Sequence, residues 1–352
     1  MTKAETNTAT NTAANTVTSA ATTAPSNTVF DVIVVGGGAA GLGGALTLAR
    51  ARRSVLVIDA GEPRNAPAEG VHGYLTRDGM NPSDLLAVGR VEVRGYGGQI
   101  IEGTVTSAAR DSESGELTVT LADGSTLRAR RLLIATGLVD ELPDLPGLRE
   151  LWGRGVVHCP YCHGWEIRDR AVGVLALGPL SVHQALLFRQ WSTDITFFPH
   201  TGPEPTAEQA EQFAARGIRI VSGEVSGLEI SAGRLTGVRL RDGATVPVQA
   251  LAIGARMAAR SAVLDGVGLK PTAHMLGNGF GEHIAAEDPS GRTSVPGVWV
   301  AGNITDLAAT VIGSAAAGVG AAAAINFDLV TEDTQRAVEA LRAGDGDRVP
   351  AR

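Results

Sequence analysis

Cysteine is scarce in this chain, which has only two in 352 residues. A disulfide-stabilised secreted scaffold needs more cysteines than this, so that class is excluded. The shortage favours a reducing compartment, where a cysteine pair is more often chemical than structural. Both cysteines lie in the segment Cys159-Pro160-Tyr161-Cys162. Each therefore has only the other as a disulfide partner within the chain.

Positive charge is also scarce. The 30 Lys and Arg residues against 37 Asp and Glu residues give a net charge of −7, and no basic stripe is present. Nucleic-acid binding and attachment to an anionic membrane surface therefore have no electrostatic basis. Residues 1–28 lack the apolar core of a secretory signal and the arginines of a transit peptide. We expect a disordered tail there and a cytoplasmic protein.

One long stretch, from Leu307 to Ile325, lacks charge altogether. Its length is sufficient to span a membrane. However, nine of its residues are alanine and three are glycine, and such small residues contribute little to membrane insertion. We therefore expect a buried, closely packed helix rather than a membrane span.

Glycine is abundant, with 45 residues, and the first glycine-rich segment follows a β-branched run over 29–35. The segment reads Gly36-Gly37-Gly38-Ala39-Ala40-Gly41 and leads into a helical stretch, Leu42 to Arg52. In a strand–turn–helix unit Gly36 permits the tight turn, Gly38 lets a pyrophosphate approach, and Gly41 lets helix and strand pack closely. The phosphates would then meet the helix N-terminus at Ala39 and Ala40.

A second strand, Ser54 to Ile58, ends in Asp59, 23 positions after Gly36. This spacing is typical of the carboxylate that accepts a hydrogen bond from a ribose 2′-hydroxyl. The pattern predicts a dinucleotide-binding βαβ unit. A glycine-rich turn with a surface aspartate is the alternative.

The Cys-x-x-Cys segment brings two sulfurs close enough to form a disulfide, and the first cysteine of such pairs is commonly a reactive thiolate. Exchange would proceed through a mixed disulfide. Three other interpretations stay open: a zinc site with His158 and His163, a c-type haem attachment through Cys-x-x-Cys-His, and a purely structural disulfide. Adjacent residues rarely reach one zinc ion together, and haem attachment generally requires export. We therefore expect redox chemistry and no metal.

Three segments together resemble a known family. Trp152 to Gly164 resembles the redox-active segment of low-molecular-weight thioredoxin reductases, with the same motif order from about Val29 to Val330. Residues 133–137 and 293–303 resemble the flavin-binding motifs of disulfide reductases with two dinucleotide domains. The resemblance implies FAD, with contacts from Thr136, Gly137, Gly302 and Asn303.

The resemblance also implies an α/β fold with two Rossmann-like three-layer domains. The FAD domain would be discontinuous, formed by residues 29–145 and 272–330. A module like an NAD(P)H domain, residues 146–271, would be inserted between them and would carry the cysteines. Residues 331–352 would form a C-terminal helix or tail. The family further implies a homodimer.

In that family the second cysteine faces the flavin and the first attacks the substrate, which assigns these roles to Cys162 and Cys159. His163 stands where the reductases carry an aspartate. Because an imidazole titrates near neutrality, His163 is a candidate acid–base group. A merely hydrogen-bonded histidine is the alternative. His158 could stabilise the Cys159 thiolate, but a neighbour in sequence need not face the sulfur.

The expected NADPH site departs from the family pattern. The reductases carry a G-x-G-x-x-A turn where this chain reads Ala176-Leu177-Gly178-Pro179-Leu180-Ser181. Pro179 removes a backbone N–H from this turn. Residues 199–204 lack the arginine that binds the 2′-phosphate of NADPH. We expect this domain to be retained as a fold without its nucleotide.

This combination resembles the FAD-dependent dithiol oxidases of the gliotoxin and holomycin type, which form a disulfide in a small molecule and pass electrons to oxygen. The stretches Asp59 to Arg64 and His72 to Gly79 also resemble this subgroup. Arg64 and His72 are thus candidate FAD contacts, although His72 could be a plain loop histidine. The alternatives are an NADPH-dependent thioredoxin reductase-like enzyme, with a thioredoxin-like partner, and a flavin redox sensor.

Overall fold

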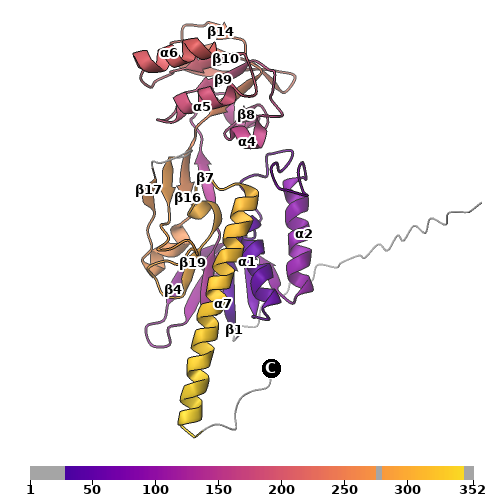
Figure 1. Cartoon of the computed structure of the whole chain (residues 1–352), viewed down its shortest axis with the longest axis vertical. Coiled ribbons are helices and arrows are strands. Elements are labelled where there is room, and N and C mark those ends of the chain that lie inside the picture. The colour runs from indigo at the N-terminus through magenta and orange to yellow at the C-terminus, as the bar shows by residue number, and fades with distance from the viewer. Residues whose placement is uncertain (1–27, 275–279, 345–352) are drawn as a thin grey trace, which may run out of the picture.

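The computed structural model describes residues 28–274 and 280–344. Apart from Thr28, the tail predicted to be disordered lies outside the described residues, as does the end of the chain from residue 345. Figure 1 shows a larger lobe that contains α1, α2 and α7, and a smaller lobe that contains α5 and α6. Each lobe is built around a parallel β-sheet.

The larger lobe contains a seven-stranded sheet in the order β3-β2-β1-β6-β5-β4, with β19 paired to the end of β6. Strands β1, β2, β3, β6 and β19 are parallel, whereas β4 and β5 run antiparallel beside β6. The strands are β1 (Val29–Val35), β2 (Val55–Asp59), β3 (Gln99–Glu102), β4 (Val105–Arg110), β5 (Leu117–Leu121), β6 (Thr126–Ile134) and β19 (Val298–Val300). Since β19 pairs with β6, this domain is discontinuous, as predicted.

The smaller lobe contains a five-stranded parallel sheet in the order β11-β10-β9-β15-β8. Apolar side chains of α5 and α6 cover one face, and an antiparallel sheet, β12-β13-β14, covers the other. This arrangement confirms a second Rossmann-like domain with three layers. Its elements are α3 (Leu148–Leu151), β8 (Val156–Val157), α4 (Pro160–His163), β9 (Val172–Leu175), α5 (Ser181–Phe188), β10 (Ile195–Phe198), α6 (Ala207–Arg216), β11 (Arg219–Ile220), β12 (Val225–Ser231), β13 (Arg234–Leu240), β14 (Thr245–Val246) and β15 (Ala250–Ile253).

The chain passes between the lobes along two strands that pair with each other. Strand β7 (Leu138–Glu141) leads toward the smaller lobe and β16 (Arg256–Ala259) leads back, in an antiparallel pair. Strand β18 (Gly281–His283) extends this sheet and is followed at its edge by β17 (Thr272–His274), while a 3₁₀ helix, η1 (Ala262–Val267), packs on β4. The exact domain limits at 145 and 271 stay predictions.

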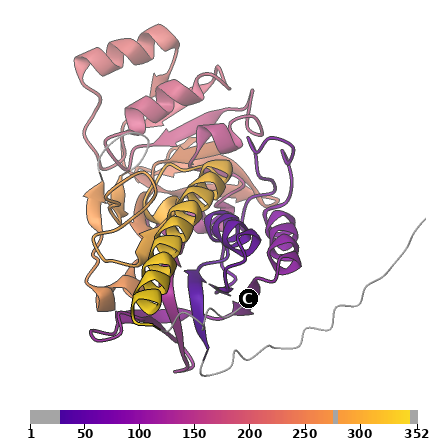
Figure 2. The same ribbon diagram turned by 60° about the horizontal axis from the view of Figure 1, so that its bottom comes forward.

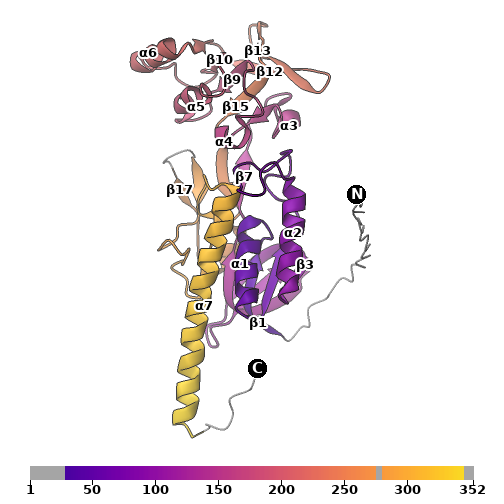
Figure 3. The ribbon, with the colours of Figure 1, turned by 45° about the vertical axis from the view of Figure 1, so that its right-hand side comes forward.

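Helices α1 (Ala39–Arg50), α2 (Pro82–Gly95) and α7 (Val311–Arg342) lie in the larger lobe, where a 3₁₀ helix, η2 (Gly302–Ile304), precedes α7. Figures 2 and 3 show α7 running alongside α1. The two helices approach so closely that a Cβ atom at Gly318 would lie 1.9 Å from the carbonyl oxygen of Ala40. Small residues therefore serve helix packing here.

The expectation of a buried helix holds for only one face of α7. Gly318, Ala322 and Ile325 are buried, whereas the side chain of Phe327 is 76% exposed. By length and composition α7 could span a membrane, a property that it shares with core helices of soluble proteins. Its contacts with α1 make it part of the larger domain.

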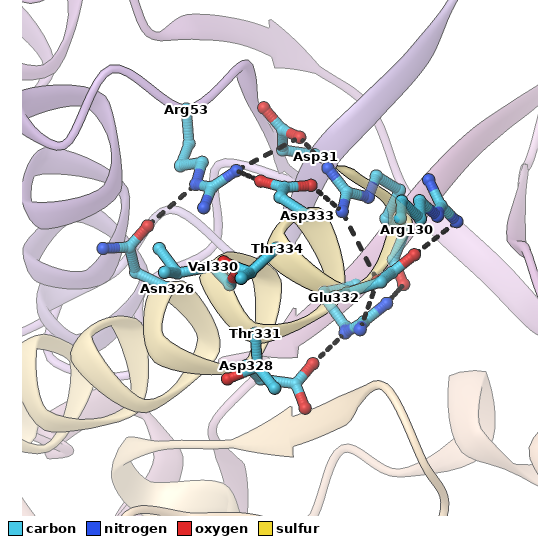
Figure 4. Close-up of polar contacts among 12 residues, drawn as sticks. Asp31, Arg53, Arg130, Asn326, Asp328, Val330, Thr331, Glu332, Asp333 and Thr334 are labelled. Carbon is cyan, nitrogen blue, oxygen red and sulfur yellow. Dashed lines mark hydrogen bonds and ion pairs between the residues drawn. The ribbon is translucent and has the colours of Figure 1, made fainter. Parts of the chain in front are cut away.

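A network of ion pairs joins α7 to the sheet (Figure 4). Arg130 on β6 donates to the carboxylate of Asp31 over 2.8 Å, and Arg53 donates to Asp333 of α7 over 2.7 Å. The Asp31 carboxylate also accepts from the backbone N–H of Ser54. Further pairs connect Arg131 to Asp328 and Glu332. These ion pairs hold α7 to the sheet beyond its apolar stretch, as far as Asp333.

Burial alone would raise the pKa of Asp31, but hydrogen bonds from Ser54 and Arg130 outweigh it and hold this pKa below its ordinary value. A carboxyl whose pKa is lower in the folded protein stabilises the fold above its unfolded pKa, and that stabilisation is lost as the pH falls through the folded pKa. The network therefore weakens in acid.

We predict that Asp31→Asn lowers the free energy of unfolding by about 2 kcal/mol at neutral pH, because it removes a charged hydrogen-bond acceptor from Arg130. Urea unfolding measures the effect. The difference from the wild type should shrink as the pH falls below about 3.9, where the unfolded wild-type carboxyl becomes protonated, and should be smallest below the lower pKa of the folded carboxyl. Glu339→Gln, on the exposed end of α7, is the control and should change stability by under about 0.5 kcal/mol. If Asp31→Asn lowered the free energy of unfolding by the same amount at all pH values, this account would be contradicted.

Candidate functional site

A cleft of about 1150 Å³ lies between the lobes and is lined by residues of both. The structure brings together in it all the predicted site residues except Gly41, which lies behind the glycine turn. These cleft residues are Gly36, Gly38, Ala39, Ala40, Asp59, Arg64, His72, Thr136, Gly137, Cys159, Cys162, His163, Gly302 and Asn303.

The three motif glycines of the first domain each meet a different requirement. Gly36 has a φ of +103°, and a Cβ atom there would lie 2.4 Å from the carbonyl oxygen of Ala135. A Cβ atom at Gly41 would lie 1.8 Å from the carbonyl oxygen of Gly36. Gly38, in contrast, has no heavy atom within 4 Å of that position. Two glycines thus permit close packing, and the third leaves space in front of the turn.

Helix α1 begins at this open turn. Its N-cap is Gly38, which provides no side-chain hydrogen bond to the first turn. The first N–H groups of a helix have no partner within the helix and attract anions. Because the start of α1 lines the cleft, it fits the pyrophosphate of a dinucleotide such as FAD.

Asp59 helps to fix the same turn. One carboxylate oxygen accepts from the backbone N–H of Gly37 over 3.1 Å, and the other accepts from Arg90 of α2 over 2.7 Å. A carboxylate can accept further hydrogen bonds, so the predicted contact with a ribose hydroxyl stays a proposal. The motif gave no signal for Arg90, which lies 31 positions later.

The two predicted flavin motifs meet beside α1, at the carboxyl ends of their strands. Thr136 and Gly137 follow β6, and the Thr136 hydroxyl donates to the carbonyl of Arg260 over 2.6 Å. Gly302 follows β19 with a φ of +80°, and a Cβ atom there would lie 2.8 Å from the Cβ of Ala40. Segments far apart in sequence thus converge at this edge of the sheet, where open α/β sheets bind ligands.

Arg64 reaches the cleft but is already paired. Its guanidinium donates two hydrogen bonds, of 2.8 and 2.6 Å, to Asp140 on β7, and a longer one of 3.5 Å to Asn303. The Asn303 amide in turn donates to the carbonyls of Asp306 and Ala309 over 3.0 Å. Arg64 therefore links the loop before α2 to the strand that crosses between the lobes. The sequence gave no signal for Asp140.

Cys159 and Cys162 form a disulfide at the cleft. Cys159 is the N-cap of α4, and its sulfur accepts from the backbone N–H of Cys162 over 3.2 Å. Pro160 occupies the first helical position, where the lack of an N–H carries no cost. The local sequence thus folds the two cysteines into bonding distance and gives the Cys159 sulfur a hydrogen-bond donor.

Two buried histidines flank the disulfide. Burial lowers the pKa of His163, and within the described chain its two ring nitrogens are buried without a hydrogen-bond partner. The Nδ1 of His158 lies 3.1 Å from the carbonyl oxygen of Ile253, and burial, together with the charge of Arg64, lowers its pKa. Because a carbonyl only accepts, the hydrogen of neutral His158 is assigned to Nδ1. Both imidazoles are neutral above about pH 6.5 and able to accept a proton.

His72 lies on the loop between β2 and α2 and contacts the redox segment. Its Nε2 lies 3.4 Å from a carboxylate oxygen of Glu166, and its Nδ1 lies 3.5 Å from Asp78. The predicted FAD contact of His72 stays a proposal. Glu166 was not identified from the sequence, because its significance depends on this contact between lobes.

The corresponding turn of the second domain is closed. The hydroxyl of Ser181 accepts from the backbone N–H groups of Leu177 and Gly178 over 3.2 and 3.3 Å. A Cβ atom at Gly178 would lie 2.7 Å from the ring of Phe280, so this side chain covers the turn. His200, after β10, accepts from the backbone N–H of Val225. Two backbone N–H groups of this turn and the His200 imidazole are thus engaged within the protein.

Comparisons with known proteins agree with this architecture. The family model described as pyridine nucleotide-disulphide oxidoreductase matches residues 30–322. The thioredoxin reductase tcpT of Claviceps purpurea is 31% identical over 287 residues, which are 79% of this chain and 87% of that protein.

Two solved structures extend the comparison. The crystal structure of HlmI is 45% identical, with a TM-score of 0.83 over 90% of this chain and 97% of HlmI. An oxidoreductase from Agrobacterium tumefaciens is 34% identical, with a TM-score of 0.80 over 86% of this chain and 99% of that structure. The resemblance to thioredoxin reductase-like flavoproteins is confirmed, and it identifies FAD as the cofactor. The chain belongs to the pyridine nucleotide-disulphide oxidoreductase family and is a flavin-dependent enzyme that acts on sulfur groups.

Proposed function

We propose that this protein oxidises a small-molecule dithiol to a disulfide through Cys159 and Cys162, with oxygen as the final electron acceptor. The substrate loses two electrons and two protons as its sulfurs bond, and the protein disulfide becomes a dithiol. FAD, when bound, supplies the redox group that reoxidises this dithiol and delivers two electrons to oxygen, giving hydrogen peroxide.

The closed turn at Ser181 is the observation that carries this proposal. A nucleotide phosphate needs free backbone N–H groups at such a turn, whereas those of Leu177 and Gly178 are bonded to Ser181. Phe280 also covers Gly178. Without a binding site for NADPH, the electrons enter the protein from the thiols of the substrate.

The cysteine pair and its neighbours supply the thiol chemistry. A substrate thiolate attacks the Cys159 sulfur, the protein disulfide breaks, and Cys162 leaves as a thiolate. The second substrate thiolate then attacks the mixed disulfide, and Cys159 leaves in turn. The N–H of Cys162 favours that leaving thiolate, because it already donates to the Cys159 sulfur. Neutral His163 accepts the proton that a substrate thiol loses on attack.

Aromatic side chains around the disulfide suit a compact apolar substrate. Tyr161 lies between the two cysteines in sequence, is 65% exposed, and contacts Trp191 edge-on with ring centroids 5.8 Å apart. Exposed aromatic faces stack readily on flat apolar groups. We therefore expect a cyclic or aromatic dithiol.

A second candidate function is an NADPH-dependent thioredoxin-disulfide reductase with a thioredoxin-like partner. It is favoured by the similarity to tcpT, which is named as a thioredoxin reductase. Ser181 and Phe280 argue against it, because they engage the turn that NADPH would use.

We further propose a cytoplasmic homodimer that binds neither nucleic acid nor membrane. The scarcity of cysteine and the acidic net charge support the location and the absence of such partners. Apolar side chains on the face of α7 away from α1, such as Val319, Phe327 and Val330, are exposed and support self-association.

Anaerobic stopped-flow absorption of the FAD-loaded protein distinguishes the two functions. We predict that a small dithiol such as dithiothreitol bleaches the flavin band, whereas NADPH leaves it unchanged on the same timescale. The reason is that the dithiol can reduce the Cys159–Cys162 disulfide and, through it, FAD, whereas NADPH has no site from which to reduce either group. Rapid bleaching by NADPH would overturn the oxidase proposal.

Single cysteine variants test the assigned roles. We predict that Cys162→Ser, incubated with a monothiol supplied as its linear disulfide, forms a mixed disulfide on Cys159: the Cys159 thiolate attacks that disulfide, one monothiol leaves as a thiolate, and no second protein thiol remains to resolve the adduct. Cys159→Ser should retain FAD, form no such adduct and lose dithiol turnover at least about 1000-fold. Mass spectrometry of the intact protein detects the adduct. An adduct on Cys162 in Cys159→Ser, with turnover retained, would reverse the two roles.

A further inference from the structure

Glu166 follows the redox segment closely in sequence and contacts a histidine of the other lobe. It lies three residues after His163 in the redox segment, and its carboxylate faces the Nε2 of His72 at 3.4 Å. His72 belongs to the loop that extends from the larger lobe toward α4 (Figures 1 and 3). The side chains of Glu166 and His72 are 39% and 25% exposed, whereas both ring nitrogens of His163 are buried.

We propose that Glu166 is a positioning residue shared by His163 and His72. Its negative charge supports the protonated form of His163 during thiol exchange, and His72 determines how much of that charge acts on His163. The inference rests on the proposed function of His163 as the proton acceptor. It assigns the contact between the lobes a role in the chemistry of the disulfide.

The environment of His163 makes such a partner necessary. A protonated imidazole with buried ring nitrogens carries a large desolvation penalty, which the backbone of Cys159 offsets only in part, since the net shift of the His163 pKa is downward. Burial is the largest influence on His163 and lowers its pKa; the charge of Glu166 opposes burial, and that of protonated His72 reinforces it. Glu166 is therefore the carboxylate that makes protonation of His163 attainable.

His72 is held where it can compete for that carboxylate. Its Nδ1 faces Asp78 at 3.5 Å, and Asp78 accepts from the backbone N–H of Gly73 over 2.8 Å. When protonated, His72 bridges the two carboxylates and offsets part of the Glu166 charge. The charges of Arg64, Asp140 and His163 also act on His158, the residue before Cys159.

The proton balance of the exchange step shows when this charge matters. The substrate S–H bond breaks and its proton goes to His163, while the substrate sulfur bonds to Cys159. The protein S–S bond breaks, and its electron pair stays on Cys162 as a thiolate, which then takes the proton back from His163. Glu166 stabilises the imidazolium between these two transfers.

Opposite charge changes on the two partners test the proposal. Protein labelled with ¹³C at histidine Cε1 and loaded with FAD is titrated with acid and followed by NMR. The signal that is missing from the spectrum of His163→Gln is assigned to His163. Glu166→Gln should shift the His163 midpoint to lower pH, because it removes a supporting negative charge. His72→Asn should shift it to higher pH, because it removes an opposing positive charge. Glu166→Asp, which retains the charge, should restore most of the wild-type midpoint.

Glu69→Gln is the matched control, because Glu69 is an exposed carboxylate on the same loop as His72. In this variant the titration midpoint of His163 should equal that of the wild type. The pH dependence of disulfide reduction by one monothiol, followed by alkylation and mass spectrometry, should shift in the same directions as the midpoints. Shifts of the same sign in Glu166→Gln and His72→Asn, or no shift in either, would overturn the proposal. The NMR midpoint is measured on the resting protein and does not depend on turnover. A protein that does not oxidise dithiols would contradict the proposed function, whereas absent midpoint shifts would contradict this inference.

Discussion

Backbone N–H groups at two strand-to-helix turns determine what each domain can bind. At the first turn α1 begins without a side-chain cap and Gly38 faces open space, so its N–H groups suit the pyrophosphate of FAD. At the second turn the Ser181 hydroxyl accepts hydrogen bonds from the backbone N–H groups of Leu177 and Gly178, and Phe280 covers Gly178. The same fold thus appears twice with opposite consequences for nucleotide binding, and the proposed direction of electron flow follows from that difference.

The cleft between the domains places the redox pair where both substrate and cofactor can reach it. Strands β7 and β16 cross between the lobes side by side, and Arg64 is bonded to Asp140 on one of them. The loop before α2 contacts the redox segment through His72 and Glu166. Charged side chains of both domains therefore lie near the site where the proposed thiol exchange releases protons. In the proposed mechanism, this division gives the Cys-x-x-Cys-His segment charged neighbours from both domains.

Much of the cofactor site was predictable because it depends on short-range rules. The β-branched run predicted a strand that begins at Val29, as observed, and the glycine spacing identified the turn before α1. Gly36 and Gly41 are required by contacts within a few ångströms of their own backbone, which is why such motifs are readable. The Ala176 to Ser181 segment likewise predicts a turn that binds no nucleotide, and the hydrogen bonds that Ser181 accepts support this prediction.

The remaining features depend on contacts between residues distant in sequence, for which no local spacing exists. Arg90 on Asp59, Asp140 on Arg64 and Glu166 on His72 all belong to this class. The apolar stretch alone did not predict the full length of α7, because ion pairs of Asp333 with Arg53 and Arg130 continue its contact with the sheet beyond that stretch.

The central claim is that thiols, not NADPH, supply the electrons that reach oxygen. The most direct test is the stoichiometry of hydrogen peroxide against disulfide formed by the FAD-loaded protein, with a small dithiol in air-saturated buffer and no nicotinamide present. The account predicts one peroxide for each disulfide, sustained over many turnovers. Disulfide formation that requires added NADP⁺, or that proceeds without peroxide, would contradict it.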